Sequence, residues 1–149
     1  MIASVGAVCA AVLIVCVPKF EGLVLRGYKD PIGIVTACAG HTATAVLGRV
    51  YTVAECEKLL EDDLVSHAEG VKACITHPLT TYQLAAAVSF AYNIGVPRFC
   101  GSTMAEKFNR GDIKGACAEL SRWTRAGGKV LPGLVKRRAA ERAMCEKDL

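Results

Sequence analysis

The order of hydrophobic and polar positions divides the chain into an apolar start, a turn-rich polar stretch and a series of helical segments. Residues 1–17 are uncharged and mostly apolar. Residues 28–42 alternate turn residues with short β-prone runs, which predicts a small hairpin, and residues 43–51 are predicted to be a loop. Beyond this loop apolar residues recur at helical spacing, so we expect the rest of the chain to be mainly helical.

Two long helices are predicted in the middle of the chain. Thr52 is followed three residues later by Glu55, the pattern of a capping box at a helix start, and this helix is predicted to run to about Lys72. Its inward residues are predicted to be Leu59, Leu60, Leu64 and His67. Thr80 and Gln83 repeat the capping signature before a segment that is apolar on nearly all sides. We expect that segment to be the buried central helix.

Shorter helices are predicted to complete the chain. Ser102 begins one that ends near Asn109, and Asp112 caps the next. A tight glycine turn at residues 127–128 follows, and Pro132 begins the last helix. The predicted fold is therefore α+β but mainly α, with a small hairpin lobe, a long connecting helix and a C-terminal helical lobe. At 149 residues the chain is long enough to bury a core as one domain.

The apolar residues 1–17 are shorter than the roughly 20 residues that span a bilayer. A cleavable signal peptide is disfavoured because the segment lacks a basic start and a small-x-small site before Pro18. A lipoprotein signal is disfavoured because valine precedes both Cys9 and Cys16. We interpret the segment as a retained, weakly held membrane segment, with a buried core helix as the alternative. Cys9 and Cys16 would share one helix face, and we interpret them as small apolar residues of a helix in lipid.

Eight cysteines are many for this length, and none has the spacing of a zinc site. Disulfides formed in an oxidising compartment are the better interpretation, although six cysteines in the polar body leave the pairing open. The three histidines, His41, His67 and His77, are scattered and argue against a metal-dependent amidase. We therefore expect neither a metal nor another cofactor.

The net charge of +4 is unevenly distributed. Residues 18–103 hold 7 basic and 8 acidic side chains, whereas residues 104–149 hold 11 and 6. A basic C-terminal half favours an anionic partner such as cell wall, lipid head groups or nucleic acid, although a solvated surface accounts for most of these charges. Nothing resembles a nucleic-acid motif, and the aromatic residues are too few for base stacking, so no nucleic-acid partner is expected.

Two carboxyl groups and a hydroxyl group near the N-terminus are candidates for catalysis. Glu21 ends an apolar turn, Asp30 lies in a polar turn nine residues later, and Thr36 follows after six more. Carboxyls in unlike surroundings suit glycosidic bond cleavage, because the less solvated one keeps its proton and the better solvated one stays ionised. The spacing alone is a weak signal.

The residues around this spacing carry more information. They closely resemble the catalytic segment of phage lysozymes, the endolysins of Glu-x8-Asp-x5-Thr pattern, at Glu21–Leu23, Tyr28–Pro31, Gly33, Thr36 and Gly40–Thr42. The resemblance continues from Pro18 to the C-terminus. It implies a lysozyme-like fold and a muramidase that hydrolyses the β-1,4 bond between N-acetylmuramic acid and N-acetylglucosamine in peptidoglycan. In that activity Glu21 is the acid, Asp30 activates water and Thr36 helps to place it, and separate acid and base imply inversion.

The resemblance also assigns supporting roles. His41 is expected to pair with Asp63 and fasten the hairpin to the long helix. Asn93 is expected to face the cleft and hold substrate or water, the alternative being an ordinary asparagine near a helix C-terminus. Arg137 or Arg138 is expected to support the acidic catalytic region, the alternative being an exposed helix face. The implied disulfides are Cys38–Cys56, Cys74–Cys100 and Cys117–Cys145.

In resembling endolysins an N-terminal segment such as residues 1–17 is a signal-arrest-release segment, preceding a catalytic domain at 18–149. It implies export by the host secretion machinery, tethering to the inner membrane, and release to the periplasm on loss of membrane potential. Glu21 lies four residues beyond the segment, so we expect tethering to keep the catalytic region from assembling. The released enzyme is expected to be a monomer that acts in host cell lysis.

Two alternative functions remain open. A lytic transglycosylase needs only one carboxyl, because the muramyl hydroxyl replaces water, and Asp30 and Thr36 argue against it. A noncatalytic wall- or membrane-binding lysis protein would use the apolar segment and the basic half without cleaving a bond. Lysis that survives Glu21→Gln would favour this second alternative.

Overall fold

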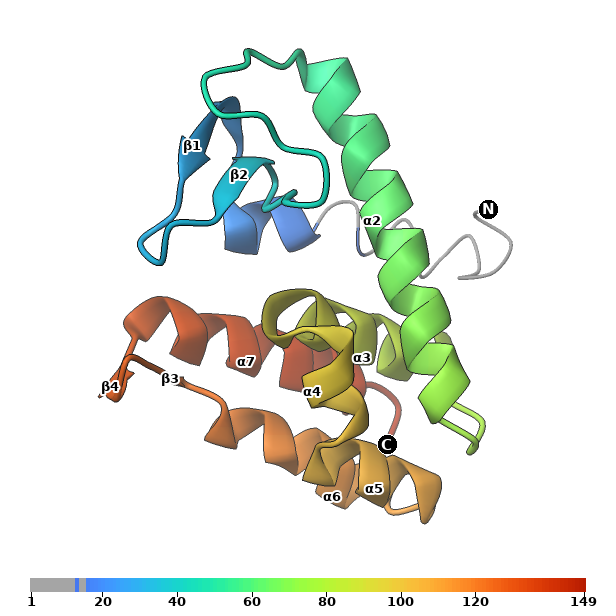
Figure 1. The fold of residues 1–149 in the computed structure, drawn as a ribbon. Helices are drawn as coiled ribbons and strands as arrows, with labels where there is room; N and C mark the ends of the chain where they lie inside the picture. Colours follow the sequence, from blue (N-terminus) through green and yellow to red (C-terminus); the bar gives the residue numbers. More distant parts are fainter. Residues whose placement is uncertain (1–12, 14–15) are drawn as a thin grey trace.

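The computed structural model describes residue 13 and residues 16–149, which form two lobes joined by a long helix (Figure 1). The predicted membrane segment therefore lies largely outside the described residues. The upper lobe contains the β1–β2 hairpin, Val24–Lys29 and Val35–Cys38. Helix α2, Val53–Cys74, runs from this lobe to the helical lobe below. The helical lobe consists of α3 Thr81–Ile94, α4 Val96–Cys100, α5 Thr103–Asn109, α6 Ile113–Glu119, the 3-10 turn Leu120–Arg122, β3 Arg125–Ala126, β4 Lys129–Val130 and α7 Pro132–Cys145.

The upper lobe contains more regular structure than the sequence predicted. The prediction was a hairpin over residues 28–42 followed by a loop over residues 43–51. Strand β1 begins at Val24 and pairs antiparallel with β2. The predicted loop 43–51 returns along the other edge of β1, where the amide of Gly27 donates to the carbonyl of Arg49 over 2.9 Å. A Cβ at Gly27 would lie 2.0 Å from the Val46 carbonyl oxygen, so only glycine permits this approach. These backbone hydrogen bonds to β1 give residues 43–51 a defined conformation, which the hydrophobic pattern of the sequence does not reveal.

Helix α2 begins as predicted and ends slightly later. The Thr52 hydroxyl oxygen accepts the amide hydrogen of Glu55 over 3.1 Å. The Glu55 carboxylate accepts a hydrogen bond from Arg49 over 3.2 Å, so Thr52 caps the helix without the reciprocal bond of a capping box. The last residue is Cys74, two beyond the predicted end at Lys72.

Helix α3 is the buried centre of the main core, as its apolar sequence predicts. Its Ala85–Ala91 stretch is buried between α2, α4 and α7. Two of the predicted inward residues of α2, Leu60 and Leu64, are buried, whereas Leu59 and His67 are partly buried. The same core contains two residues of the N-terminal segment, because Leu13 and Val17 are both fully buried in it. The apolar start of the chain therefore contributes side chains to the folded domain.

A one-turn helix and a hairpin of two very short strands are absent from the sequence predictions. Helix α4 is a single turn that follows Gly95, and its Pro97 fixes a helical φ in that turn. The predicted Gly127–Gly128 turn is present with both φ angles positive, but it also joins the two-residue strands β3 and β4. Segments this short contain too few residues for a periodic pattern to be read.

Three disulfides join elements that are distant in the sequence. Cys38–Cys56 ties β2 to α2, Cys74–Cys100 ties the end of α2 to α4, and Cys117–Cys145 ties α6 to α7. These are the pairs that the resemblance implied. Cross-links of this kind reduce the freedom of the unfolded chain and hold the two lobes and their helices together.

Within the described part of the chain, no helix has both the length and the apolar character needed to cross a membrane.

Candidate active site

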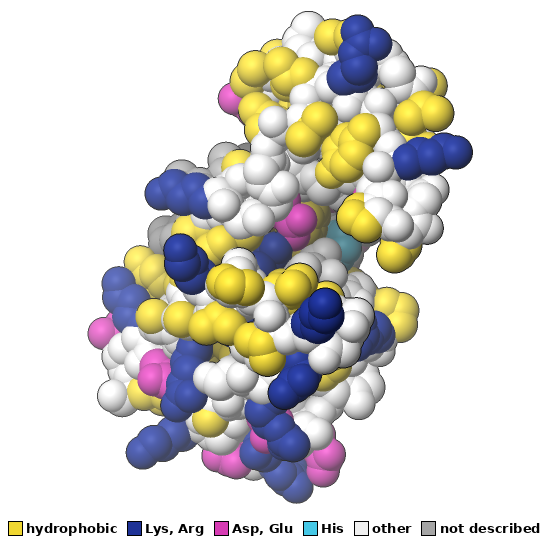
Figure 2. Space-filling view, turned by 90° about the vertical axis from the view of Figure 1, so that its left-hand side faces the viewer, with side chains coloured by type: hydrophobic (Ala, Val, Ile, Leu, Met, Phe, Trp, Pro, Cys, Tyr) yellow, Lys and Arg dark blue, Asp and Glu magenta, His cyan; other side chains and the backbone are white. Residues whose placement is uncertain are grey.

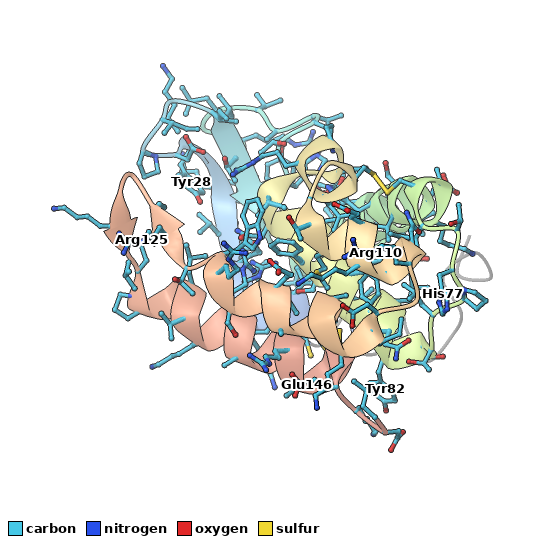
Figure 3. The ribbon with its side chains drawn as sticks, turned by 90° about the horizontal axis from the view of Figure 1, so that it is seen from below. Tyr28, His77, Tyr82, Arg110, Arg125 and Glu146 are labelled. Atoms are coloured by element: carbon cyan, nitrogen blue, oxygen red, sulfur yellow. A yellow bond between two sulfur atoms is a disulfide. The ribbon has the colours of Figure 1, made fainter. Side chains whose placement is uncertain are left out.

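A cleft of about 770 Å³ separates the hairpin lobe from the helical lobe. Figure 2 shows this hollow between the lobes, with an acidic side chain inside it and basic side chains spread over the helical lobe. The candidate residues Glu21, Asp30, Thr36 and Asn93 all line the cleft. Seen from below, Tyr28 of β1 and Arg125 of β3 lie on the same side of the molecule, one on each lobe (Figure 3).

Glu21 is the last residue of the helix over residues 16–21. Its side chain is 22% exposed, and its Oε1 accepts a hydrogen bond from Nη1 of Arg137 on α7. The Arg137 guanidinium also lies over the ring of Phe20, 5.0 Å from its centroid. On the other side, a Cβ at Gly40 would stand 3.2 Å from Glu21 Oε2, and Gly40 has a φ of +78°. Arg137 thus binds one carboxyl oxygen, and the lack of a side chain at Gly40 leaves room for the other.

Asp30 lies in the turn between β1 and β2. Its Oδ1 accepts two backbone hydrogen bonds, from Ile32 over 3.0 Å and from Ile34 over 2.8 Å. Thr36, on β2, is buried and donates its hydroxyl hydrogen to the carbonyl of Ile34 over 3.0 Å. The hydroxyl oxygen of Thr36 therefore keeps its lone pairs for a donor such as water. One turn thus positions both the carboxylate and the hydroxyl.

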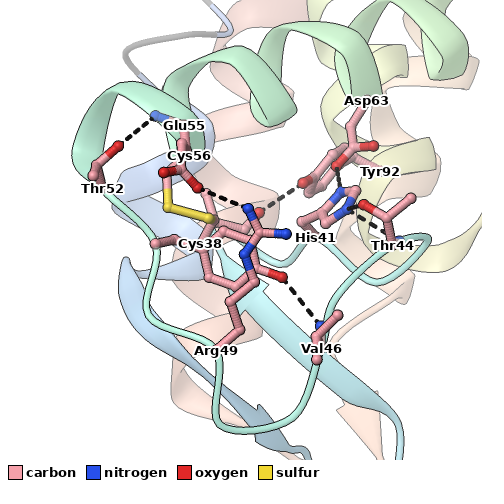
Figure 4. The surroundings of a disulfide bond; sticks show 12 residues. Cys38, His41, Thr44, Val46, Arg49, Thr52, Glu55, Cys56, Asp63 and Tyr92 are labelled. Atoms are coloured by element: carbon pink, nitrogen blue, oxygen red, sulfur yellow. Dashed lines mark hydrogen bonds and ion pairs between the residues drawn. A yellow bond between two sulfur atoms is a disulfide. The ribbon is translucent and has the colours of Figure 1, made fainter.

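The hairpin lobe is fastened to α2 by His41 (Figure 4). His41 Nδ1 is 2.7 Å from Oδ2 of Asp63, and Nε2 receives the amide of Thr44 over 3.2 Å and lies 2.6 Å from its hydroxyl. Because an amide can only donate, Nε2 is the acceptor and Nδ1 carries the proton that points to Asp63. The predicted His41–Asp63 contact is therefore present, at the side of the cleft where α2 meets the hairpin.

Tyr92 of α3 makes a second connection between the lobes that sequence reasoning missed. Its hydroxyl donates to the carbonyl of Ala39 over 2.6 Å. Burial, and after it the nearby carboxylates of Asp63 and Glu21, raises the pKa of Tyr92 well above its usual range. The phenol therefore stays protonated and remains a donor. The available signal was a tyrosine next to Asn93 in an otherwise apolar helix.

The two adjacent arginines of α7 have different partners. Arg137 donates to Glu21, to the carbonyl of Ser89 over 2.9 Å and to Glu141. Both arginines are buried, so the alternative of an exposed helix face is wrong for them. The support expected from Arg137 or Arg138 is given to Glu21 by Arg137, because α7 directs its side chain to that end of the cleft.

Arg138 contacts the C-terminal end of α3. It donates to Asn93 Oδ1, to the carbonyl of Trp123 over 2.9 Å and to Glu141 over 2.5 Å. Burial lowers the pKa of Arg138 from its usual value, while the charge and hydrogen bond of Glu141 act against that shift. Asn93 lies inside α3, whose C-cap is Gly95, and with its oxygen bound to Arg138 it presents its amide hydrogens as donors.

The structure thus brings the candidates into one arrangement. Glu21, Asp30, Thr36 and Asn93 share the cleft, while His41, Asp63 and Arg137 hold its walls in place. The cleft is also lined by Ile32, Ile34, Ser66 and Tyr92, to which the sequence analysis gave no part in the site, and by Tyr28 and Thr42, which belong to the motifs of the resemblance. In the described part of the chain, no group of three or more His, Cys, Asp or Glu side chains is placed to hold a metal ion.

Comparison with known proteins agrees with this architecture. Residues 18–141 match the family described as phage lysozyme. The chain is 42% identical to a SAR-endolysin of Bacteriophage PS119 over 147 residues, which cover 95% of this chain and 88% of the relative. It is 41% identical to a SAR-endolysin of Enterobacteria phage P21 over 145 residues, 94% of this chain and 88% of that one.

Solved structures show the same fold. The muramidase domain of SpmX from Asticaccaulis excentricus superposes with a TM-score of 0.84 at 32% identity, over 91% of this chain and 95% of that chain. The endolysin from Escherichia coli O157:H7 phage FAHEc1 gives a TM-score of 0.80 at 28% identity, over 92% of both chains. The chain belongs to the phage lysozyme family. It is a peptidoglycan-degrading lysozyme, and its relatives make it a phage endolysin of the SAR type. The predicted lysozyme-like fold is confirmed.

Proposed function

We propose that this protein hydrolyses the β-1,4 bond between N-acetylmuramic acid and N-acetylglucosamine with inversion at the anomeric carbon. The observation that carries the proposal is that Glu21 and Asp30 line one cleft in unlike settings. Glu21 is paired with a buried guanidinium, whereas Asp30 is held by backbone amides in a turn. Two carboxyls held independently can divide the roles of acid and base.

Glu21 is the proposed general acid. In the productive complex it enters as the protonated carboxyl and transfers its proton to the glycosidic oxygen as the bond to the anomeric carbon breaks. Arg137 then stabilises the carboxylate that remains, because its guanidinium contacts Oε1 directly. Gly40 leaves room beside Oε2, where a larger residue would crowd the carboxyl.

Asp30 is the proposed base, and Thr36 helps to place the attacking water. The two backbone amides that donate to Asp30 Oδ1 fix the direction of its carboxyl group. Thr36 donates to Ile34, so its oxygen accepts a hydrogen from the water. Water that loses its proton to Asp30 attacks the face opposite the leaving group, which inverts the configuration.

Product analysis tests this mechanism. Digestion of purified Gram-negative peptidoglycan is expected to yield reducing N-acetylmuramic acid ends that form first as the α-anomer, seen by NMR before mutarotation. Glu21→Gln is expected to lose activity while remaining folded. An anhydro-muramyl product would identify a lytic transglycosylase instead, and full lysis by Glu21→Gln would identify a noncatalytic lysis protein.

We further propose that residues 1–17 tether the exported enzyme to the inner membrane and keep it inactive until it is released to the periplasm. The similarity to SAR-endolysins supports this proposal. So does the burial of Leu13 and Val17 in the core, because the same side chains cannot occupy lipid and the core together. Release would let Val17 enter the core and bring Glu21, four residues later, to Arg137.

Fractionation tests the tethering. Expressing cells are separated into membrane and periplasmic fractions, and each fraction is assayed on purified peptidoglycan after quantification of the protein. The membrane-bound protein is expected to be inactive per molecule and the periplasmic protein active. Equal specific activity in the two fractions would contradict the off-switch.

A further inference from the structure

Glu141 is a fully buried carboxylate at the centre of a polar network in the helical lobe. Its Oε2 accepts hydrogen bonds from Ser89 Oγ over 2.6 Å and from Arg137 Nε over 3.2 Å. Its Oε1 accepts one from Arg138 Nη1 over 2.5 Å. A buried charge is tolerated when it is paired and hydrogen-bonded in this way, and such networks have few alternative arrangements.

The network has two arms, and each arm ends at the cleft. One runs from Glu141 through Arg137 to Glu21, and the other runs from Glu141 through Arg138 to Asn93. Glu21 and Asn93 both line the cleft, whereas Glu141 does not. Glu141 is therefore connected to two cleft residues that come from different parts of the chain.

The arm to Glu21 has a defined geometry because a guanidinium is planar and rigid. Arg137 directs Nε to Glu141 and Nη2 to the Ser89 carbonyl, which points Nη1 at Glu21. Without Glu141 the plane is held by one fewer acceptor and can turn. A displacement of about 1 Å at a reacting group can cost roughly a hundredfold in rate.

We propose that Glu141 is a positioning residue for catalysis. Through Arg137 it sets the direction of the Glu21 carboxyl, and through Arg138 it sets the amide of Asn93. The first arm controls the turnover number and the second controls the apparent affinity for the glycan. This inference rests on the proposed role of Glu21 as the acid.

A purely structural role for Glu141, neutralising two buried arginines, must be separated from positioning. The chain contains a matched control in Glu119, which is also largely buried and also bonds two basic side chains, Lys107 over 2.7 Å and Arg122 over 3.3 Å. None of these three residues lines the cleft. Glu119→Gln therefore removes a comparable buried charge without touching either arm.

The experiment compares Glu141→Gln, Glu119→Gln and the unchanged protein by thermal unfolding and by kcat and KM on purified peptidoglycan, with reducing ends as the readout. Glu141→Gln is expected to lower kcat about tenfold or more and to raise KM, whereas Glu119→Gln changes neither. Two further variants, each combined with Glu141→Gln, show which arm carries which effect. In Arg137→Met the added Glu141→Gln is expected to leave kcat unchanged, and in Asn93→Ala it is expected to leave KM unchanged.

Glu141→Asp keeps the charge but shortens the reach, and it takes the place of Glu141→Gln if that variant does not fold. Wild-type kcat and KM in a folded Glu141 variant would overturn the proposal, as would equal losses in the Glu119 control. Additive losses in both backgrounds would also overturn it, because Glu141 would then act through neither arm. The proposed acid is tested separately in the same assay, since an active Glu21→Gln removes that assignment whatever Glu141 does.

Discussion

Arg137 donates a hydrogen bond to Glu21 across 116 residues of sequence. The contact joins the helix over residues 16–21 to α7, the last helix of the chain. A carboxyl near one end of the protein is thus oriented by a guanidinium near the other. The proposed acid is in place only when the whole domain has folded, which suits the proposed inactivity of the tethered form.

Replacing Arg137 with lysine tests this contact. The variant keeps the positive charge, but an ammonium group cannot reproduce the rigid fork that serves Glu21, Ser89 and Glu141 together. We expect kcat on peptidoglycan to fall by about ten- to a hundredfold while the protein stays folded. Arg110→Lys is the control, since Arg110 lies on the exposed surface of the helical lobe (Figure 3) in a pair with Glu106. Equal activity of the two variants would contradict the orienting role.

Gly40→Ala tests the crowding of Glu21. Both Gly40 and Gly48 have positive φ, +78° and +80°, so alanine is strained at either position and is expected to cost about 1–2 kcal/mol of stability. At Gly40 the added Cβ also meets Glu21 Oε2 at 3.2 Å, whereas at Gly48 it meets no atom within 4 Å. We therefore expect only Gly40→Ala to lose much of its kcat. Urea unfolding and lysis assays of both variants separate strain from crowding, and a similar loss of activity in both would show that strain alone is responsible.

Leu13→Ala tests whether the N-terminal segment belongs to the working fold. Leu13 is fully buried in the main core, so its truncation is expected to lower the free energy of unfolding of the purified protein by about 2–5 kcal/mol. The exposed Val130 provides the control, and Val130→Ala is expected to change stability by less than about 0.5 kcal/mol. Equal unfolding midpoints in urea for Leu13→Ala and the unchanged protein would show that residues 1–17 serve only as a membrane tether. A form without these residues is expected to be destabilised as well, since it also loses Val17.

The Lys107–Glu119 pair predicts a particular dependence of stability on pH. The hydrogen bond from Lys107 lowers the pKa of Glu119 from its usual range, against the opposing effect of burial. A carboxyl whose pKa is lowered by folding stabilises the protein above its unfolded pKa, and this contribution is lost as the pH falls through the folded pKa. The wild type is therefore expected to be more stable than Glu119→Gln at neutral pH, and the difference is expected to shrink below about pH 4. Melting temperatures measured from pH 7 down to pH 2 check this, and a constant difference would contradict it.

Much of the fold and of the candidate site was open to prediction because it depends on local rules. The apolar run of α3, the caps Thr52 and Asp112, and the turn chemistry around Asp30 each act within a few residues of sequence. The resemblance of residues 21–42 to phage lysozymes added candidates whose roles neighbouring residues alone do not indicate. Those roles stay proposals, although the structure places Glu21, Asp30, Thr36 and Asn93 in one cleft.

The remainder was decided by tertiary structure, because it depends on contacts between distant segments. The sequence left the choice between Arg137 and Arg138 open, and only the packing of α7 against α3 turns the first to Glu21 and the second to Asn93. Glu141 carried no signal as one acidic residue in a charged helix, and its importance comes from complete burial between two arginines. Sequence alone determined which segments form helices and turns and which residue types are available for chemistry. Tertiary structure determined which side chains meet, because desolvation and hydrogen-bond geometry arise only when separate elements pack together.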